Sequence, residues 1–263
     1  MVRVQKWKVW GSVVEVDVTE AAALPEAAAL IADVIDEAES VCDIHRGDAE
    51  IHAVNLSQGA PVKVSRRMSA LLRSALWVAR MTDGAVNPLI SEPSDDSVPT
   101  VHPEPSFLDV QIDDDVVFAP WGASFDITDT AKADTVGRAA ELVAGELECG
   151  AAVRIDDVIA TAGHCPAGGW QIPVPGDDEI ELANGTAMAT AFALSDEPSA
   201  ATDADAVPEW EAVTVIADDA LWAYGAAATA LMRGGGAIRW IEQHELRARL
   251  VDRSGRVYTT GNW

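Results

Sequence analysis

Strand and helix patterns follow one another in this chain without regular alternation, and this order limits the folds open to it. Alternating β-branched residues predict strands at 2–9 and 13–18, joined by a hairpin around Trp10–Ser12. Apolar residues at helical spacing then predict a helix over 20–42. Neither a βα repeat nor any other internal repeat follows. The chain is therefore expected to be an α+β protein.

The same patterns predict the remaining elements. Asp48 is expected to cap a short helix that ends at Asn55, and Ser65 a second helix that stops at Gly84. Strands are expected near 108–112, 115–118, 151–160, 187–194 and 212–217, helices over 129–147, 218–232 and 237–245, and a final pair of short strands. Glycine and proline punctuate 162–178. We expect one domain over 1–263, with a possible lobe boundary in the loop 91–106.

The charge balance narrows the classes of partner. The chain has 43 acidic and 18 basic residues, a formal net charge of −25, and only four lysines. Such an acidic surface is typical of a halophilic protein, because concentrated salt shortens the Debye length to about 3 Å and screens the self-repulsion. Nucleic acid and anionic membranes are disfavoured, since both require a basic surface.

The amino-terminal residues and the cysteines indicate location and redox chemistry. The start alternates polar and apolar residues, which predicts neither a signal peptide nor a membrane anchor, so a cytoplasmic location is expected. The three cysteines are Cys42, Cys149 and Cys165, and they form no CxxC pair. Cys42 and Cys149 are expected to be buried thiols.

A series of short motifs carries a family resemblance. The order is WGS followed by VVEVDV, DAEIHAVN ending in Asn55, PVKVS, TDGAVNPLI, DITDTAKADTVG, MATA around Thr190, VTVIA, AYGAAATAL and RLVDRSGRV. In DITDTAKADTVG, Asp126, Ala131 and Lys132 fall in register with a family block that reads DLGGIAKGYAVD. The chain resembles the FAD:protein FMN transferase family, the ApbE or "thiamine biosynthesis lipoprotein" family, over about 10–260.

The resemblance implies a fold, a reaction and a set of site residues. The fold would be ApbE-like and T-fold-related, with two lobes of mixed sheets, packed helices and a cleft between the lobes. Family members bind FAD and Mg²⁺ and transfer the FMN half to a Thr or Ser hydroxyl of a target flavoprotein. The resemblance assigns catalytic roles to Asp126 and Lys132, and flavin binding to these two with Gly11, Ser12, Asn55 and Thr190.

Several positions depart from the family pattern. The two glycines of DLGG are Thr128 and Asp129 here, and those of NAGGD are Asp156 and Asp157. Glycine allows backbone to approach a ligand closely. Asp129 adds bulk and charge where a pyrophosphate would lie, or it caps the following helix. Lys132 pairs with a phosphate or with Asp126, or it is a surface lysine of that helix.

The metal-binding residues of the family are also changed. The expected aspartate is Tyr224, Thr229 lies one residue out of register with the metal-binding threonine, and Ala131 offers a backbone carbonyl. The HIxDPxTG block has no counterpart in 195–211. Mg²⁺ prefers carboxylate oxygen, so Ala131 and Thr229 would form a weak site. Trp10 is either a packing residue or a stacking partner for the isoalloxazine ring.

Two functional hypotheses follow. The first is an FAD:protein FMN transferase-like protein that acts on a target flavoprotein. The second is a catalytically degenerate homologue that serves as a flavin- or protein-binding module.

Overall fold

The computed structural model describes residues 3–90, 104–176, 178–193 and 210–263. The chain divides into two compact units, Met1–Ile31 with Val136–Trp263 (unit 1) and Ala32–Thr135 (unit 2). Both boundaries lie inside helices. A lobe boundary in the loop 91–106 stays a prediction, and residues 91–103 lie outside the described residues. Within the described ranges, no helix is long and apolar enough to cross a membrane.

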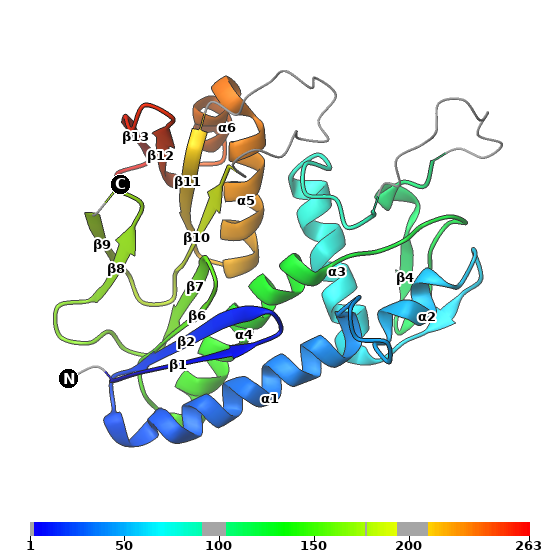
Figure 1. Ribbon diagram of the computed structural model, residues 1–263, viewed down its shortest axis with the longest axis horizontal. Coiled ribbons are helices and arrows are strands. Elements are labelled where there is room, and N and C mark those ends of the chain that lie inside the picture. Colours follow the sequence, from blue (N-terminus) through cyan, green and yellow to red (C-terminus); the bar gives the residue numbers. More distant parts are fainter. Residues whose placement is uncertain (1–2, 91–103, 177, 194–209) are drawn as a thin grey trace. The chain divides into compact units, whose positions relative to one another are not determined.

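The helices and strands are numbered in chain order (Figure 1). The helices are α1 (Leu24–Cys42), α2 (Ile51–Asn55), α3 (Arg66–Met81), α4 (Thr128–Leu147), α5 (Ala220–Met232) and α6 (Ala237–Gln243), with short 3-10 helices η1 (Ala21–Ala23), η2 (Phe107–Asp109) and η3 (Gly234–Gly236). The strands are β1 (Arg3–Val9), β2 (Ser12–Val18), β3 (Val62–Lys63), β4 (Gln111–Asp113), β5 (Val116–Phe118), β6 (Ala151–Ile155), β7 (Val158–Ala162), β8 (Trp170–Val174), β9 (Asp178–Leu182), β10 (Ala187–Phe192), β11 (Trp210–Ala217), β12 (Arg247–Asp252) and β13 (Val257–Thr260).

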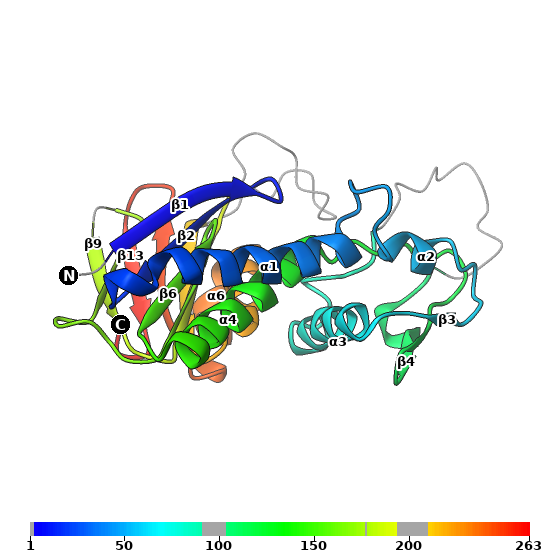
Figure 2. The same ribbon diagram turned by 90° about the horizontal axis from the view of Figure 1, so that it is seen from below.

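Unit 1 is built on an antiparallel sheet of eight strands in the order β1-β2-β6-β7-β10-β11-β12-β13. Alternate residues of β2 are buried on one face, including Val14, Val16 and Val18. Helix α5 packs on β10 and β11, while the first turns of α1 and the second half of α4 cover the β2–β6 part of the same face (Figures 1 and 2).

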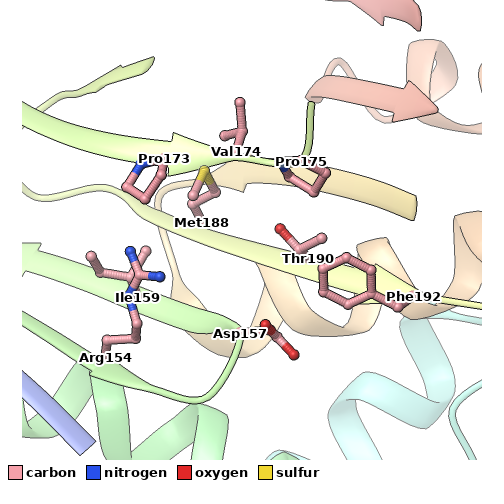
Figure 3. Close-up of a pocket in the computed structure, with 9 residues that line it drawn as sticks. All are labelled: Arg154, Asp157, Ile159, Pro173, Val174, Pro175, Met188, Thr190 and Phe192. Atoms are coloured by element: carbon pink, nitrogen blue, oxygen red, sulfur yellow. The ribbon is translucent and has the colours of Figure 1, made fainter. Parts of the chain in front are cut away.

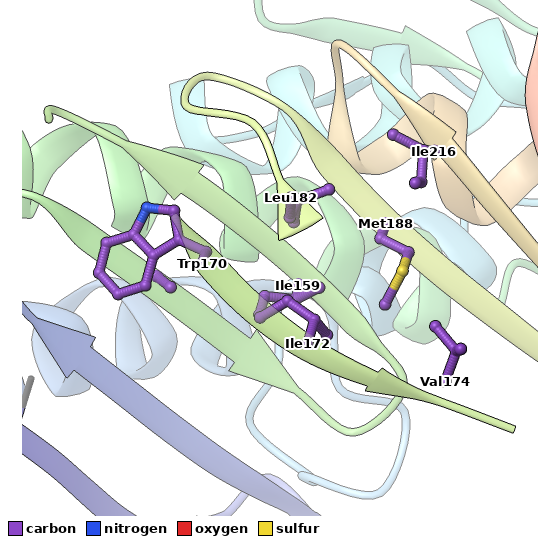
Figure 4. Close-up of a cluster of buried hydrophobic side chains, with 8 residues drawn as sticks. Ile159, Trp170, Ile172, Val174, Leu182, Met188 and Ile216 are labelled. Carbon is purple, nitrogen blue, oxygen red and sulfur yellow. The ribbon is translucent and has the colours of Figure 1, made fainter. Parts of the chain in front are cut away.

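The β8–β9 hairpin covers the opposite face of this sheet. Trp170, Ile172 and Val174 of β8 and Leu182 of β9 pack on Ile159 of β7, and the cluster extends to the neighbouring strands (Figure 4). The members from the other strands are Ala152, Met188 and Ile216. Burial of an aliphatic side chain contributes about 1.5–3 kcal/mol, so this cluster fixes the hairpin on the sheet.

Unit 2 combines α2, α3 and the three-stranded sheet β3-β5-β4. Ser65 begins α3 in extended backbone, and its hydroxyl accepts a hydrogen bond from Met68 N at 3.1 Å. The buried face of α3 includes Met68, Leu71 and Leu72. Arg67 joins this buried face through an ion pair with Asp134 at 2.9 Å.

Most of the predicted elements are confirmed. The β1–β2 hairpin, the Ser65 cap, helix α4 and the final strand pair lie where they were expected. The class is α+β, with several sheets and, among the described residues, six α-helices. Cys42 and Cys149 are buried, as predicted.

Two local predictions were wrong. The segment 151–160 is not one strand but the pair β6–β7, which reverses at Asp156 in left-handed backbone (φ 49°) without a glycine. Asp48 does not cap α2, because its carboxylate pairs with Arg46 at 2.9 Å and the α2 N-cap is Glu50. No element was predicted for the Gly/Pro-punctuated stretch 162–178, which contains β8 and begins β9.

Asp17 on β2 gives the unfolding free energy a pH dependence. Burial, together with the nearby Glu15, raises the pKa of this carboxyl to about 6, and Lys6 and Arg154 oppose the increase. The folded state therefore holds a proton that the unfolded state releases near pH 4, so stability is expected to fall between pH 4 and pH 6. Because asparagine does not titrate, Asp17→Asn should make the decrease in unfolding free energy between pH 4 and pH 6 smaller by about 1 kcal/mol. This value includes a reduction for the partial exposure of Asp17 to solvent. Melting temperatures of both proteins against pH test this, and parallel curves would contradict it.

Candidate functional site

Asn55 holds the segment that leads to Asp126. Its side-chain Nδ2 donates to the carbonyl of Phe125 at 3.0 Å, and its Oδ1 accepts from Phe125 N at 2.8 Å. The same segment pairs with 88–90, where Asp126 N donates to Pro88 O at 3.0 Å and Leu89 bridges to Phe125. Asn55 is therefore a positioning residue within unit 2. Both polar atoms of its side-chain amide are used by the backbone of Phe125.

The residues after Phe125 form the amino-terminal end of α4. The Asp126 carboxylate accepts a hydrogen bond from Thr128 N at 3.0 Å, so Asp126, rather than Asp129, caps the first turn. Asp129 is exposed in that turn, and Ala131 is buried with its N–H bonded to Ile127 O. The buried Thr128 Oγ1 has no hydrogen-bond partner among the described residues. This end of α4 can therefore receive an anion, because its dipole and N–H groups favour negative charge.

Lys132 stands one turn further along α4 and is half-buried. Its charge acts on Glu39 of α1, whose pKa is raised mainly by burial and by Asp43, while Arg46 and Lys132 oppose the increase. Unit 2 therefore places Lys132 within electrostatic range of Glu39 on α1. A phosphate at the end of α4 would compete with this carboxylate for the ammonium group of Lys132.

Gly11 and Ser12 belong to the β1–β2 turn of unit 1. Trp10 and Gly11 both have positive φ (52° and 68°), which matches the two central positions of a type I′ hairpin turn. Trp10 is buried, 7% exposed, and Ser12 Oγ donates to its carbonyl at 3.3 Å. The turn alone therefore accounts for Gly11 and Ser12, and their roles in flavin binding stay predictions.

Thr190 lies at the same end of the eight-stranded sheet. The β6–β7 turn lies between the β1–β2 turn and Thr190 and is bonded to both sides. Val13 N donates to Asp156 Oδ1 at 2.9 Å, and Thr190 N donates to Asp157 O at 3.0 Å. The Thr190 hydroxyl shares a hydrogen bond of 3.0 Å with that of Thr214. Unit 1 thus brings Gly11, Ser12 and Thr190 to the same end of its sheet, and unit 2 holds Asn55, Asp126, Ala131 and Lys132.

A cavity of about 210 Å³ opens beside Thr190 in unit 1 (Figure 3). Its polar lining is Arg154, Asp157 and Thr190, and its apolar lining includes Ile159 and Met188. The other lining residues are Pro173, Val174, Pro175 and Phe192. The cavity therefore offers a cation, a carboxylate and a hydroxyl beside an apolar wall, a combination suited to a ring with a polar edge.

Arg154 and Asp157 influence each other in this cavity. Burial raises the pKa of the Asp157 carboxyl, the neighbouring Asp156 raises it further, and Arg154 opposes the increase. The sequence identified Asp157 only as a replaced glycine and gave no role to Arg154. The position of Arg154, the single charged residue in the otherwise apolar strand β6, is the signal that could have found it.

The residues present do not fit the metal that the resemblance implies. Thr229 is fully buried, and its hydroxyl donates to Gly225 O at 2.7 Å inside α5. Tyr224 supplies no carboxylate. Across the described part of the chain, no group of three His, Cys, Asp or Glu residues could hold a metal ion. The sequence-based metal site at Ala131 and Thr229 therefore lacks the oxygen ligands that Mg²⁺ prefers.

Removal of the Asn55 amide is expected to destabilise unit 2. Asn55→Ala leaves the N–H and C=O of Phe125 without these partners, which should cost about 2 kcal/mol of unfolding free energy. Urea titration measures the change. Asn184→Ala, at an exposed turn position, is the matched control and should stay within about 0.5 kcal/mol of wild type. Equal losses in the two variants would contradict the positioning role.

Three solved structures share this fold. An apo flavinyl transferase ApbE from Pseudomonas stutzeri superposes with a TM-score of 0.80 at 16% identity, covering 99% of this chain and 95% of the other. An ApbE protein from Thermotoga maritima superposes with a TM-score of 0.82 at 18% identity, covering 100% of this chain and 98% of the other. The flavin transferase ApbE from Vibrio cholerae superposes with a TM-score of 0.73 at 14% identity, covering 99% of this chain and 98% of the other. The fold is thus that of the ApbE flavin transferases.

Sequence comparison agrees with the structural similarity. The model of the ApbE family matches residues 10–250, so this chain belongs to the ApbE family. No curated protein sequence matches it.

Proposed function

We propose that this protein is an FAD:protein FMN transferase-like protein. It binds FAD and transfers the FMN half to a Thr or Ser hydroxyl of a target flavoprotein. The observation that carries the proposal is the family match over residues 10–250, together with the Asn55 contacts that hold Asp126 at the start of α4. The similar proteins from P. stutzeri and V. cholerae are flavin transferases.

In the proposed reaction, the acceptor hydroxyl oxygen attacks the phosphorus of the FMN half. The new P–O bond forms as the pyrophosphate P–O bond breaks, and AMP leaves with the bonding electron pair. Asp126 takes the hydroxyl proton, and Lys132 pairs with the negative charge that develops on the phosphate oxygens. The unpartnered Thr128 hydroxyl and the N–H groups at the start of α4 orient a phosphate oxygen.

We also propose flavin-binding roles for Gly11, Ser12 and Thr190, which lie in unit 1. The cavity beside Thr190 provides hydrogen-bonding groups and apolar surface for part of the cofactor. Mg²⁺ has no proposed role in the step, since Tyr224 and Thr229 do not fit it. The developing charge is instead offset by Lys132 and by the amino-terminal end of α4.

A second candidate function is flavin binding without transfer. The observation that favours it is the loss of the metal ligands, with Tyr224 at the aspartate position and the Thr229 hydroxyl bonded within α5. Phosphoryl transfer requires positive charge that offsets the negative charge developing on the phosphate oxygens. Because a protein without the metal ligands supplies less of this positive charge, it would bind FAD without cleaving it.

In-gel flavin fluorescence distinguishes the two functions. The protein is incubated with FAD and a target carrying the family's acceptor motif, with and without Mg²⁺ and at low and high salt. Fluorescence that stays on the target after denaturation is the expected result. If FAD raises the melting temperature but the target stays dark, the second function holds. Neither fluorescence nor a thermal shift would overturn both.

A further inference from the structure

Helix α3 has a charge opposite to that of the chain as a whole. Its 16 residues include four arginines and no acidic residue, whereas the chain has 43 acidic and 18 basic residues. Arg67 is buried against Asp134 and serves the fold. The other three, Arg66, Arg73 and Arg80, are exposed. Helix α3, whose position in the chain is labelled in Figure 1, therefore exposes a row of cationic side chains on a strongly acidic protein.

The three exposed arginines share one side of the helix. They recur every seven residues, two helical turns or about 10 Å apart. Trp77 and Met81, each 40% exposed, lie on the same side between and beside them. We name Arg66, Arg73, Trp77, Arg80 and Met81 the arginine stripe. Arginine, tryptophan and methionine are enriched at protein interfaces, and the first two dominate binding hot spots.

Folding does not account for the stripe. Arg66 lies in the first turn of α3, where the helix dipole disfavours a cation by about 0.3–1 kcal/mol. Neither Arg66 nor Arg80 has an ion-pair partner within the described part of the chain. A solvated helix face usually gains stability from opposite charges four residues apart, and α3 has none. Arg73 donates to Asp114 O at 2.7 Å, so it differs from Arg66 and Arg80 in having a structural contact.

We propose that the arginine stripe docks an acidic amphipathic helix of a partner protein. Charge complementarity selects an acidic partner, and the seven-residue spacing matches carboxylates that recur along one side of a second helix. Arginine binds such carboxylates in bidentate geometry, and Trp77 and Met81 supply the apolar contact. The net charge of −25 repels a densely charged polyanion such as nucleic acid more strongly than a helix that carries a few carboxylates, so a protein helix is the favoured occupant.

A designed peptide tests this surface on the full chain. The probe is a fluorescein-labelled helical peptide of about three heptads, with glutamate every seventh residue and leucines beside the glutamates. Fluorescence anisotropy is measured at the lowest salt at which the protein melts cooperatively. We expect saturable binding that weakens as salt is added. The double variant Arg66→Gln/Arg80→Gln should bind at least about tenfold more weakly.

Arg239→Gln is the matched control, because it removes an exposed arginine from α6 in unit 1 and should leave the peptide affinity unchanged. If the double variant melts early, the single variants Arg66→Gln and Arg80→Gln replace it, and each should weaken binding. The proposal is overturned by an absence of saturable binding, by equal losses in the stripe and Arg239 variants, or by tighter binding of a single-stranded oligonucleotide than of the peptide.

Discussion

Gly150→Ala is expected to unfold unit 1 more readily than any other change considered. Gly150 precedes β6, and a Cβ atom there would lie 1.8 Å from the carbonyl oxygen of His164 and 2.8 Å from a methyl group of Thr19. Atoms cannot approach so closely, so the ends of β2, β6 and β7 would have to separate. Because Gly150 O accepts from Thr19 N at 3.0 Å, that separation also breaks a buried backbone contact. We expect a loss of about 3 kcal/mol or more.

Gly145→Ala is the matched control for this variant. Gly145 is exposed in α4, and a Cβ atom there would meet nothing within 4 Å. Alanine favours the helix over glycine by about 0.8–1 kcal/mol, so this variant should melt later than wild type. Thermal unfolding by circular dichroism compares both. If Gly150→Ala melted within a few degrees of wild type, the close approach of Gly150 and His164 would be wrong.

Asp126→Asn is expected to lower the rate of FMN transfer by at least about 100-fold, the usual contribution of a positioned general base. An asparagine oxygen can still accept from Thr128 N, so the start of α4 should be preserved. The amide cannot take a proton from the acceptor hydroxyl. The rate of flavin attachment to the target at saturating FAD is the appropriate measurement.

Asp129→Asn provides the comparison within the same turn. Asp129 is exposed, and its charge opposes an anion at the end of α4. This variant should keep the transfer rate and bind FAD more tightly. Equal rates for Asp126→Asn and wild type would remove Asp126 from the catalytic role.

The fold was predictable where local patterns were strong. The Trp10-Gly11 turn, the Ser65 cap and the long helix α4 all depend on residues close in sequence, and such signals can be recognised in the chain alone. The β8–β9 hairpin was missed because glycine and proline surround it and its stability comes from packing on distant strands. The β6–β7 reversal was missed because Asp156 takes a backbone conformation usually left to glycine.

The candidate site was predictable only as far as the family motifs reach. Asp126 and Lys132 were found by their register. The role of Asn55 depends on a partner 70 residues away, Phe125, which no local pattern reveals. The cavity around Arg154 and the arginine stripe of α3 follow from burial and exposure, so both required the structure.

Calorimetry of FAD binding in EDTA and in Mg²⁺ shows whether this chain needs a metal ion to hold flavin. We propose that the flavin-binding residues persist while the metal ligands are lost. Wild type should therefore bind FAD with the same affinity in both conditions, and Tyr224→Asp should make binding stronger in Mg²⁺ than in EDTA. If wild type bound FAD only in Mg²⁺, or did not bind FAD in either condition, the proposal that flavin binding persists without the metal ligands would be wrong.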